Sequence, residues 1–451
     1  MNLRRSFPAT RLLPTVALFC LACDSLHAAA LNLGEAQALL FEHHPDLQAA
    51  EVAIERAQSQ WAQSRSAYLP KIDWVGNYQI FSEKNHLEFT LPPPVNTSIS
   101  KDLGDYDRWE TGLDVTYPIF TGFARTSQVE SKSQLVAAEK ARQKALRNQA
   151  SLRLAALYYA WHMSRAKLAF EDAQCALAEG SLQVSQAQKA QGLVSERAVL
   201  TARSQSLAQQ AEKLTAANQV DSLAWEAGQW LGMPGDIVWQ LDTVMSRLPD
   251  ELPDAGPASH DGADSGALRP EIQALQHQSR ALAASEKAVH GRDWPNLTAL
   301  AGWRYADPGL NLAGTEPMAY GLAGMQLKWN LFSGGERTRQ REELRLQRRQ
   351  IAIETSKLLR EWDKNTALTK RQYKRWRLQT VSAQAALEAA ERSLLDTRRQ
   401  LDHGLATPLD TLEIRVQCER ARMLRDQSLS MQKWTYCQWL YARGETLNFQ
   451  P

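Results

Sequence analysis

The sequence reads Gly112-Leu-Asp-Val-Thr-Tyr-Pro-Ile-Phe-Thr-Gly-Phe-Ala-Arg-Thr126 and, 212 positions later, Gly324-Met-Gln-Leu-Lys-Trp-Asn-Leu-Phe-Ser-Gly-Gly-Glu-Arg-Thr338. The same offset relates Gly192-Leu193 to Gly404-Leu405, and an offset of 225 relates Pro45 to Pro270 and Pro70 to Pro295. Such repeats indicate an internally duplicated fold. Each copy reads as helix, strand, loop, strand, very long helix, turn and helix. A unit of this kind cannot close on itself.

The first thirty residues have the pattern of a secretory signal. An arginine-rich start precedes the apolar run 12–22, which is too short to span a bilayer, and a cleavage site follows at Ala28-Ala29-Ala30. Cleavage after Ala30 would remove three arginines and one aspartate from the 52 basic and 50 acidic residues, leaving 49 of each. A neutral chain does not favour nucleic acid as a partner. Cys23 offers lipidation as an alternative to ordinary cleavage.

Four segments alternate between apolar and polar side chains, as strands of an outer-membrane barrel do. The polar positions include Lys71, Asp73, Asp114 and Arg304. An apolar face that packs on a soluble core is the alternative to a face that meets lipid. The turn-rich segments 82–108 and 306–318 are expected to be loops outside the membrane. The expected apolar face carries Ile72, Trp74, Tyr78 and Ile80, then Leu113, Val115 and Tyr117, then Ala299, Ala301, Trp303 and Tyr305, and finally Met325, Leu327, Trp329 and Leu331.

Four strands leave two open edges, which lipid does not tolerate. A closed barrel needs about eight strands or more, so the chain must share its barrel with copies of itself. Three copies would give twelve strands, and two copies would also close.

Two runs are too long for the helices of a compact domain. The run 336–403 contains neither glycine nor proline, and the run 123–190 is interrupted only by Gly180. As helices they would each extend on the order of 100 Å. Each run leads through a glycine, Gly192 or Gly404, into a returning helix, at 193–227 or 409–443. The apolar positions are sparse and recur at sevens, which favours a wall one helix thick over a plain coiled-coil rod; they include Leu387, Leu394 and Leu401.

We therefore expect an α+β membrane protein. A shared transmembrane β-barrel, with four strands per chain, would continue into a long α-helical coiled-coil barrel. The expected division is a signal peptide at 1–30, a first repeat at 31–232, a proline- and glycine-rich equatorial linker at 233–268, a second repeat at 269–444 and a C-terminal tail at 445–451.

The sequence shows no constellation for catalysis. It has no phosphate-binding glycine loop, no Gly-x-Ser-x-Gly motif and no spaced cysteine and histidine set. His43 and His44 are adjacent, and adjacent side chains diverge on a helix. Cys175, Cys418 and Cys437 are odd in number and lie in helical patterns, so they are no disulfide framework. We expect no enzyme, no cofactor and no metal.

Together these features resemble the TolC-type outer-membrane export channels, over essentially the whole mature chain. The resemblance implies a homotrimer in the lipid of a bacterial outer membrane, with a helical barrel that crosses the periplasm. The helical tips would dock onto a periplasmic adaptor (membrane fusion) protein, which connects to an inner-membrane pump. The residues that carry the resemblance are the strand–helix junctions at Pro118, Gly122, Asn330 and Gly334, the pairs Leu69-Pro70 and Trp294-Pro295, and the tips Gly192-Leu193-Val194 and Gly404-Leu405-Ala406.

The resemblance also implies a gate at the periplasmic end. Two aspartates that ring the narrow end of such channels correspond to Asp410 and Glu413, and three copies would bring six carboxylates together. An ordinary solvated pair is the alternative. The tyrosine and arginine that latch the tips in the family correspond to Leu401 and Ala406, and the aspartate that would receive the arginine corresponds to Ala198. The latch is therefore missing, and Arg197 or Asp402 could replace it.

The function that follows is a passive exit duct of a tripartite exporter for small molecules. The outer-membrane component of type I protein secretion would use the same duct. A periplasmic coiled-coil adaptor is the non-channel alternative, although we would expect it to have one helical hairpin flanked by β-domains.

Overall fold

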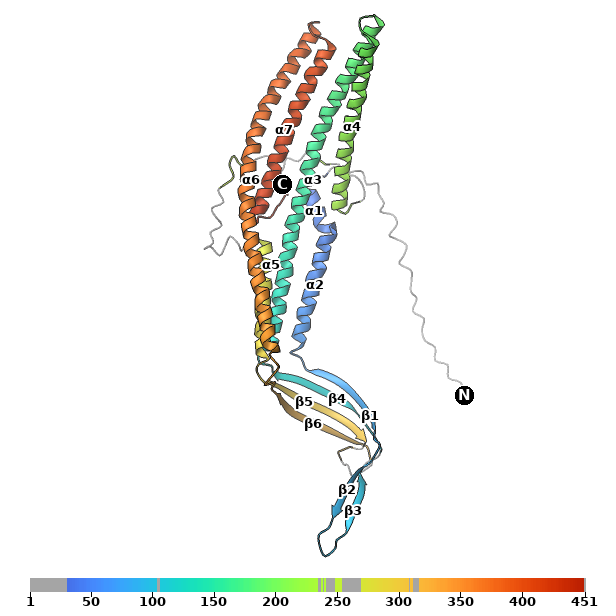
Figure 1. Cartoon of the computed structure of the whole chain (residues 1–451), viewed down its shortest axis with the longest axis vertical. Helices are drawn as coiled ribbons and strands as arrows, with labels where there is room; N and C mark the ends of the chain where they lie inside the picture. The colour runs from blue at the N-terminus through green and yellow to red at the C-terminus, as the bar shows by residue number, and fades with distance from the viewer. Residues whose placement is uncertain are drawn as a thin grey trace, which may run out of the picture.

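The computed structural model describes residues 31–103, 106–233, 237, 239–240, 248–253, 269–307, 309–310 and 316–449. The expected signal peptide, Cys23 and most of the equatorial linker lie outside these residues. Within them the chain forms a long wall of helices that joins a β-sheet at one end (Figure 1).

The first repeat starts with two helices where the sequence predicted one. They are α1 (Leu33–His43) and α2 (Pro45–Ser66), and the break falls at Pro45, which has no N–H to continue α1. Proline is instead well suited to the first position of α2. The strands β1 (Lys71–Ile80) and β4 (Asp107–Phe120) follow, and then the helices α3 (Ala124–Ala190) and α4 (Glu196–Trp230).

The segment between β1 and β4 is not the loop that the sequence predicted. It forms a second, two-stranded sheet of β2 (Asn85–Thr90) and β3 (Ser98–Leu103). The prediction was wrong because the prolines at 92–94 occupy only the turn of this hairpin. On either side of them, apolar and polar residues alternate with the period of strands.

Within the described residues, the second repeat has the same order of elements without this hairpin and without a counterpart of α1. It comprises α5 (Pro270–Gly291), β5 (Asn296–Asp307), β6 (Met318–Lys328), α6 (Glu336–Asp402) and α7 (Pro408–Arg443). Helices α2 and α5 have 22 residues each, and α3 and α6 have 67 each. The duplication in the sequence is therefore a duplication of structure. We call residues related by 225 (α2 and α5) or by 212 (from β4 and β6 onward) repeat equivalents.

The main sheet is antiparallel, with the strand order β1-β4-β5-β6. Both repeats contribute two strands, and β4 of the first pairs with β5 of the second. Strands β1 and β6 are left as open edges of this sheet within the described chain.

The helical wall has an interior and two edges. Among the described helices, α3 packs against α1, α2, α4, α5 and α7, whereas α6 packs against α5 and α7. Accordingly, 15 residues of α3 are buried and only five of α6. Figure 1 shows α6 along one edge of the wall, with α2 and α4 along the other.

The largest core lies midway along the wall, where α1 covers α3. Leu33, Leu154 and Trp239 are buried there, together with Phe449 from the C-terminal segment. The Gln37 side chain holds this segment, because its amide nitrogen donates to the Leu447 carbonyl (2.6 Å) and its oxygen accepts from the Phe449 N–H (3.0 Å). The residues up to 449 thus belong to the core rather than to a free tail.

Candidate functional site: sheet faces, junctions and helical tips

The main sheet has one apolar and one charged face, as the alternation predicted. Residues directly opposite each other share a face, and the register aligns Trp74 with Leu113 and Trp303. The other predicted apolar residues of the four strands fall on the same face. All of them except Val115 and Ala299, which are half-buried, are exposed in the single chain, with Trp74 at 73% and Met325 at 75%. This face is therefore suited to lipid.

One part of that prediction was wrong. Strand β6 ends at Lys328, so Trp329 and Leu331 lie beyond it, although both are exposed. The strand ends here because the chain turns toward α6. The Trp329 indole donates to the Asp293 carbonyl (3.0 Å) instead of continuing the alternation.

The opposite face carries a charge cluster around Arg304. Its guanidinium pairs with Asp114 (2.6 Å) and with Glu110 (3.1 Å), two residues of the neighbouring strand β4. Between them lies Gly112, directly opposite Arg304, where a Cβ would fall 2.9 Å from the arginine Cδ. Asp73 and Asp114 face each other across β1 and β4, a like-charge pair that needs a counter-ion. Arg304 supplies that positive charge.

The first strand–helix junction is a place of close backbone approach. Pro118 lies at a register shift of β4, where the missing N–H is tolerated. Gly122 has φ +60°, and a Cβ there would lie 2.0 Å from the carbonyl oxygen of Gly291 at the end of α5. A Cβ on Gly291 would in turn lie 2.5 Å from the Gly122 oxygen. Only glycine fits at these two positions.

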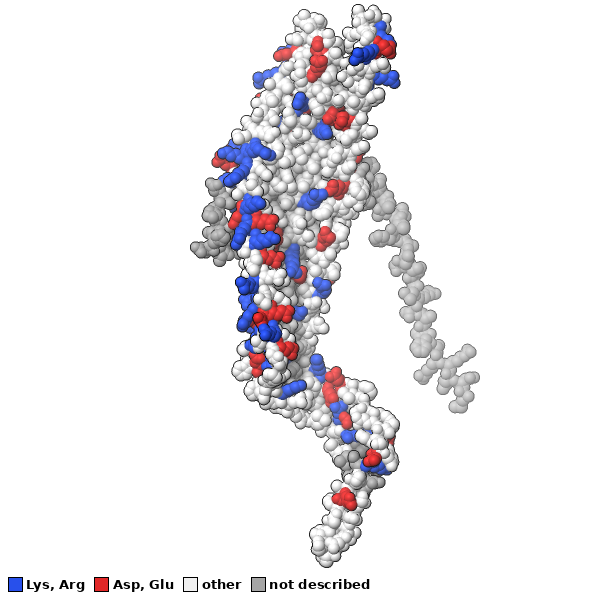
Figure 2. Space-filling model, in the orientation of Figure 1, with Lys and Arg blue, Asp and Glu red and all other residues white. Residues whose placement is uncertain are grey.

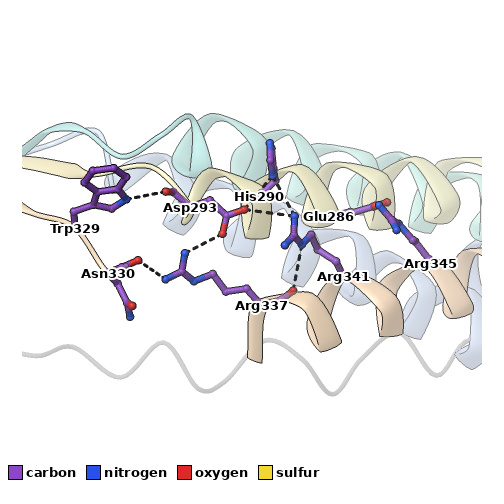
Figure 3. A network of polar contacts seen from close by, with 8 residues as sticks. All are labelled: Glu286, His290, Asp293, Trp329, Asn330, Arg337, Arg341 and Arg345. Carbon is purple, nitrogen blue, oxygen red and sulfur yellow. Dashed lines mark hydrogen bonds and ion pairs between the residues drawn. The ribbon is translucent and has the colours of Figure 1, made fainter. Parts of the chain in front are cut away.

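The second junction is held by charges, as Figure 3 shows. Arg337 donates to the Asp293 carboxylate (2.9 Å) and to the carbonyl of Asn330 (2.7 Å), so it ties the start of α6 to both neighbouring turns. Arg341 and His290 approach the same carboxylate, at 3.4 and 3.1 Å. Gly334 has φ +60° here, with no atom within 4 Å of a built Cβ.

Sequence reasoning missed the junction arginines. Arg125 is the repeat equivalent of Arg337, and it donates to the carbonyls of Ala67 (2.9 Å) and Ile119 (3.4 Å) at the first junction. It also lies over the Tyr68 ring, 5.1 Å from its centroid. Both arginines stand inside the duplicated stretch, so the duplication itself was the signal that could have found them.

The ion pairs of the second junction are expected to make the stability of the fold depend on pH. The hydrogen bond from Arg337, aided by Arg341, lowers the pKa of Asp293 below its ordinary value of 3.8. A lowered folded-state pKa stabilises the fold above the unfolded value, and this gain is lost as the pH falls through the folded value. We expect Arg337→Met to lower the melting temperature at neutral pH, and the difference from wild type to shrink once Asp293 is protonated in both proteins, down to the part that comes from the bond to the Asn330 carbonyl.

The matched control is Arg339→Met, because Arg339 is 82% exposed and pairs only with Glu342 of its own helix. Such pairs contribute little. We would record melting curves of the detergent-solubilised wild type and both variants. One set is measured at neutral pH and the other at a pH well below the ordinary carboxylate pKa. A difference for Arg337→Met that did not change with pH would contradict this account of Asp293.

The two helical tips are the same turn. Gly192 and Gly404 have φ +72° and +70°, and the N–H groups of the following leucines donate to Gln188 and Gln400, as in a Schellman motif. Leu193 and Leu405 are 69% and 79% exposed. Val194 and Ala406, which follow them, are half-buried.

The proposed gate residues lie at the start of α7, just after the second tip. Asp410 belongs to a capping box: its carboxylate accepts from the Thr407 N–H and from the Thr407 hydroxyl, both at 2.7 Å. These bonds lower the pKa of Asp410. The carboxylate of Glu413 is exposed, and Leu401 is half-buried at the end of α6. At the first tip, an ion pair between Lys189 and Glu196 joins α3 to α4.

A sheet with one apolar and one charged face, continued by a wall one helix thick, defines one sector of a tubular membrane channel. In the described ranges, no group of histidine, cysteine and acidic side chains could hold a metal ion. Among the helices of these ranges, none is both long and apolar enough to cross a membrane.

Comparison with known proteins gives the class. Residues 36–224 match the outer membrane efflux protein family. Solved structures with the same fold include the Campylobacter jejuni CmeC outer membrane channel (15% identity, TM-score 0.71, 93% of this chain and 87% of that one) and the Vibrio cholerae outer membrane protein VceC (16%, 0.66, 93% and 97%). The Neisseria gonorrhoeae MtrE outer membrane channel in its open state is also similar (14%, 0.63, 93% and 91%). Comparison with curated protein sequences gives no match.

Residues 36–224 carry the match to the outer membrane efflux protein family, and the fold of the chain is that of outer-membrane channels. Its fold is that of channels in which a β-barrel continues into a long helical barrel, and the family consists of transport channels rather than enzymes.

Proposed function

We propose that three copies of this chain form a passive exit duct that crosses the outer membrane and extends into the periplasm. Strands β1 and β6 would pair with those of neighbouring copies, because lipid does not tolerate open sheet edges. The strand directions allow this pairing. Strands β1, β4, β5 and β6 alternate in direction across the sheet, so β6 of one copy would run antiparallel to β1 of the next.

A contact inside the chain supports this most strongly. Helix α3 packs on α5, where the His277 ring nitrogen lies 2.9 Å from the Gln134 side-chain oxygen. Their repeat equivalents are Val52 on α2 and Leu346 on α6, which lie on opposite edges of the wall. Both are apolar and exposed in the single chain, at 62% and 58%. A neighbouring copy would bring them together in the same geometry.

The part of the wall nearer the helical tips also has two edges, formed by α4 and α6, that could meet between copies. Leu200, Leu207 and Leu214 recur at sevens along α4 and are 55–62% exposed. Inside the chain, Leu412 of α7 lies close to Gly180 of α3, where a Cβ would be 2.8 Å from its Cδ1. Their repeat equivalents are Leu200 and Arg392. The edge of α4 is therefore suited to packing on α6 of the next copy.

The tips are suited to docking onto a periplasmic adaptor that connects to an inner-membrane pump. Leu193 and Leu405 are the most prominent apolar side chains there, and the Schellman turns hold both in the same conformation. We expect a photo-reactive amino acid at either position to capture, in living cells, an adaptor protein of an inner-membrane pump. The same amino acid at Glu88, far from the tips, is the control.

The result of that experiment separates two kinds of cargo. An adaptor of a proton-driven pump supports small-molecule efflux, which we favour. An adaptor of an ATP-driven secretion pump would indicate type I protein secretion. Failure of both tips to capture any adaptor, with the protein present in the outer membrane, would contradict docking.

The periplasmic end of the duct would carry a gate. Three copies of Glu413 and Asp410 would place six carboxylates around the periplasmic aperture, where they would favour cations. Asp410 also caps α7, so Glu413→Gln is the cleaner test. A reversal potential that Glu413→Gln leaves unchanged would contradict the ring.

A further inference from the structure

Among the described residues, a hairpin like that of β2 and β3 occurs in the first repeat and not in the second. It leaves the end of the main sheet that is farthest from the helices (Figure 1). In the second repeat, only the segment 308–317 joins β5 to β6. The described part of each chain therefore has one such hairpin, and a trimer would bring three of them together.

The register of the hairpin separates two faces. Phe89 lies directly opposite Ile99, and Leu87 shares their face. Glu88, opposite Ser100, lies on the other face, which carries polar residues. On the face drawn in Figure 2, the tip of the hairpin is free of charged side chains, whereas Lys101 lies opposite Leu87 nearer the main sheet. We call Leu87, Phe89 and Ile99 the hairpin patch; these side chains are 42%, 58% and 52% exposed.

No helix or strand that the structure describes packs on the hairpin patch. Among the described helices and strands, β2 and β3 make extensive contacts only with each other. A two-stranded hairpin alone is marginally stable in water, and it needs a surface to pack on. Something outside the single chain is therefore expected to cover the patch.

Lipid is poorly placed to do so. Strand β4 has 14 residues. At about 3.3 Å per residue and a tilt of about 40°, such a strand rises about 35 Å, which exceeds the apolar band of about 25 Å in outer-membrane barrels. The hairpin begins beyond the end of this strand, so it lies in the water outside the membrane.

Other copies of the chain are well placed. Twelve strands about 4.8 Å apart at this tilt give a barrel about 24 Å across, so the axis lies about 12 Å from the wall. Strands of six residues, such as β2, extend about 20 Å. Three hairpins that lean over the mouth would thus meet at the axis.

We propose that the three hairpins of a trimer pack against one another through the hairpin patch and form an outer constriction over the extracellular mouth of the pore. The inference rests on the trimeric channel proposed above. It adds a second narrow place, at the end opposite the helical tips.

A single cysteine in the patch tests the contact. The cysteines of the described chain, Cys175, Cys418 and Cys437, are buried and do not compete. In outer membranes treated with an oxidant, we expect Phe89→Cys to link two chains of each trimer by a disulfide. Glu88→Cys, on the polar face, is expected to stay unlinked and to react with a membrane-impermeant maleimide. An unlinked Phe89→Cys that reacts with the maleimide as fast as Glu88→Cys would overturn the proposal.

Conductance tests the constriction separately. Replacing residues 85–103 by a short glycine-serine turn is expected to raise the single-channel conductance in planar bilayers at least twofold. An unchanged conductance of the intact trimer would overturn the constriction. Loss of the trimer itself, measured independently by a cross-link between α2 and α6, would instead count against the proposed channel assembly.

Discussion

Replacing Gly122 by alanine is expected to reduce the amount of folded channel in the outer membrane by about tenfold or more. The new Cβ would lie 2.0 Å from the Gly291 oxygen, so the start of α3 and the end of α5 would have to move apart. In addition, placing any residue with a side chain in the left-handed backbone region costs roughly 1–2 kcal/mol of folding free energy. We expect a total cost of about 4 kcal/mol or more, which only backbone or core disruption reaches. Quantitative immunoblots of outer-membrane fractions measure the loss.

Two further substitutions separate the causes of this loss. Gly192→Ala carries the same left-handed cost at φ +72° but meets no atom within 4 Å, so its yield should stay within about twofold of wild type. Gly291→Ala lies in a helix and carries only the steric part. It should be nearly as harmful as Gly122→Ala. A well-tolerated Gly291→Ala would show that the two backbones do not meet as described.

Removing Arg304 is the change on the sheet with the largest expected effect. Arg304→Met leaves Glu110 and Asp114 without their cation, and Asp73 remains opposite Asp114. The Arg304 side chain is only 13% exposed, so we expect a loss of about 2–3 kcal/mol, as for hydrogen bonds to charged groups. The uncompensated carboxylates should also shift the reversal potential of the pore toward cation selectivity.

Arg108→Met removes the same charge from the same sheet and serves as the control. Arg108 is 42% exposed and lies 3.8 Å from Glu110, so its pair should contribute less than about 1 kcal/mol. Thermal dissociation of the trimer and bilayer recordings at a salt gradient compare the two variants. Equal effects would mean that net charge, and not the bridge over Gly112, explains the result.

Strands and helices whose residue pattern repeats or runs without interruption could be predicted from the sequence. Alternation placed Trp74, Leu113 and Trp303 on one face of the sheet, and the register confirms it. The long helices followed from runs without proline, and Gly180 did not interrupt α3, since one glycine costs a helix only about 1 kcal/mol. Its lack of a Cβ instead leaves room for Leu412.

Contacts between distant segments could not be predicted. The burial of Phe449 depends on α1 and on Gln37, more than 400 residues earlier in the chain, and no local pattern encodes that contact. The approach of Gly122 to Gly291 is of the same kind. The hairpin of β2 and β3 was missed for a different reason: three prolines in its turn outweighed a short alternation of apolar residues.

The candidate site was predictable where it is local. Gly192 and Gly404 were identified as tips, and both form glycine turns in the left-handed region. The capping role of Asp410 was missed, although Thr407 stands three residues before it, as a capping box requires.

The assembly of copies into a closed tube is the central claim, and a disulfide between Val52→Cys and Leu346→Cys tests it most directly. The two side chains lie on opposite edges of one chain, and the internal pair of His277 and Gln134 predicts that they meet across the interface between copies. We expect the double variant to run as a covalent trimer on a non-reducing gel, while each single variant runs as a monomer. A double variant that stays monomeric after oxidation in the outer membrane would contradict the account.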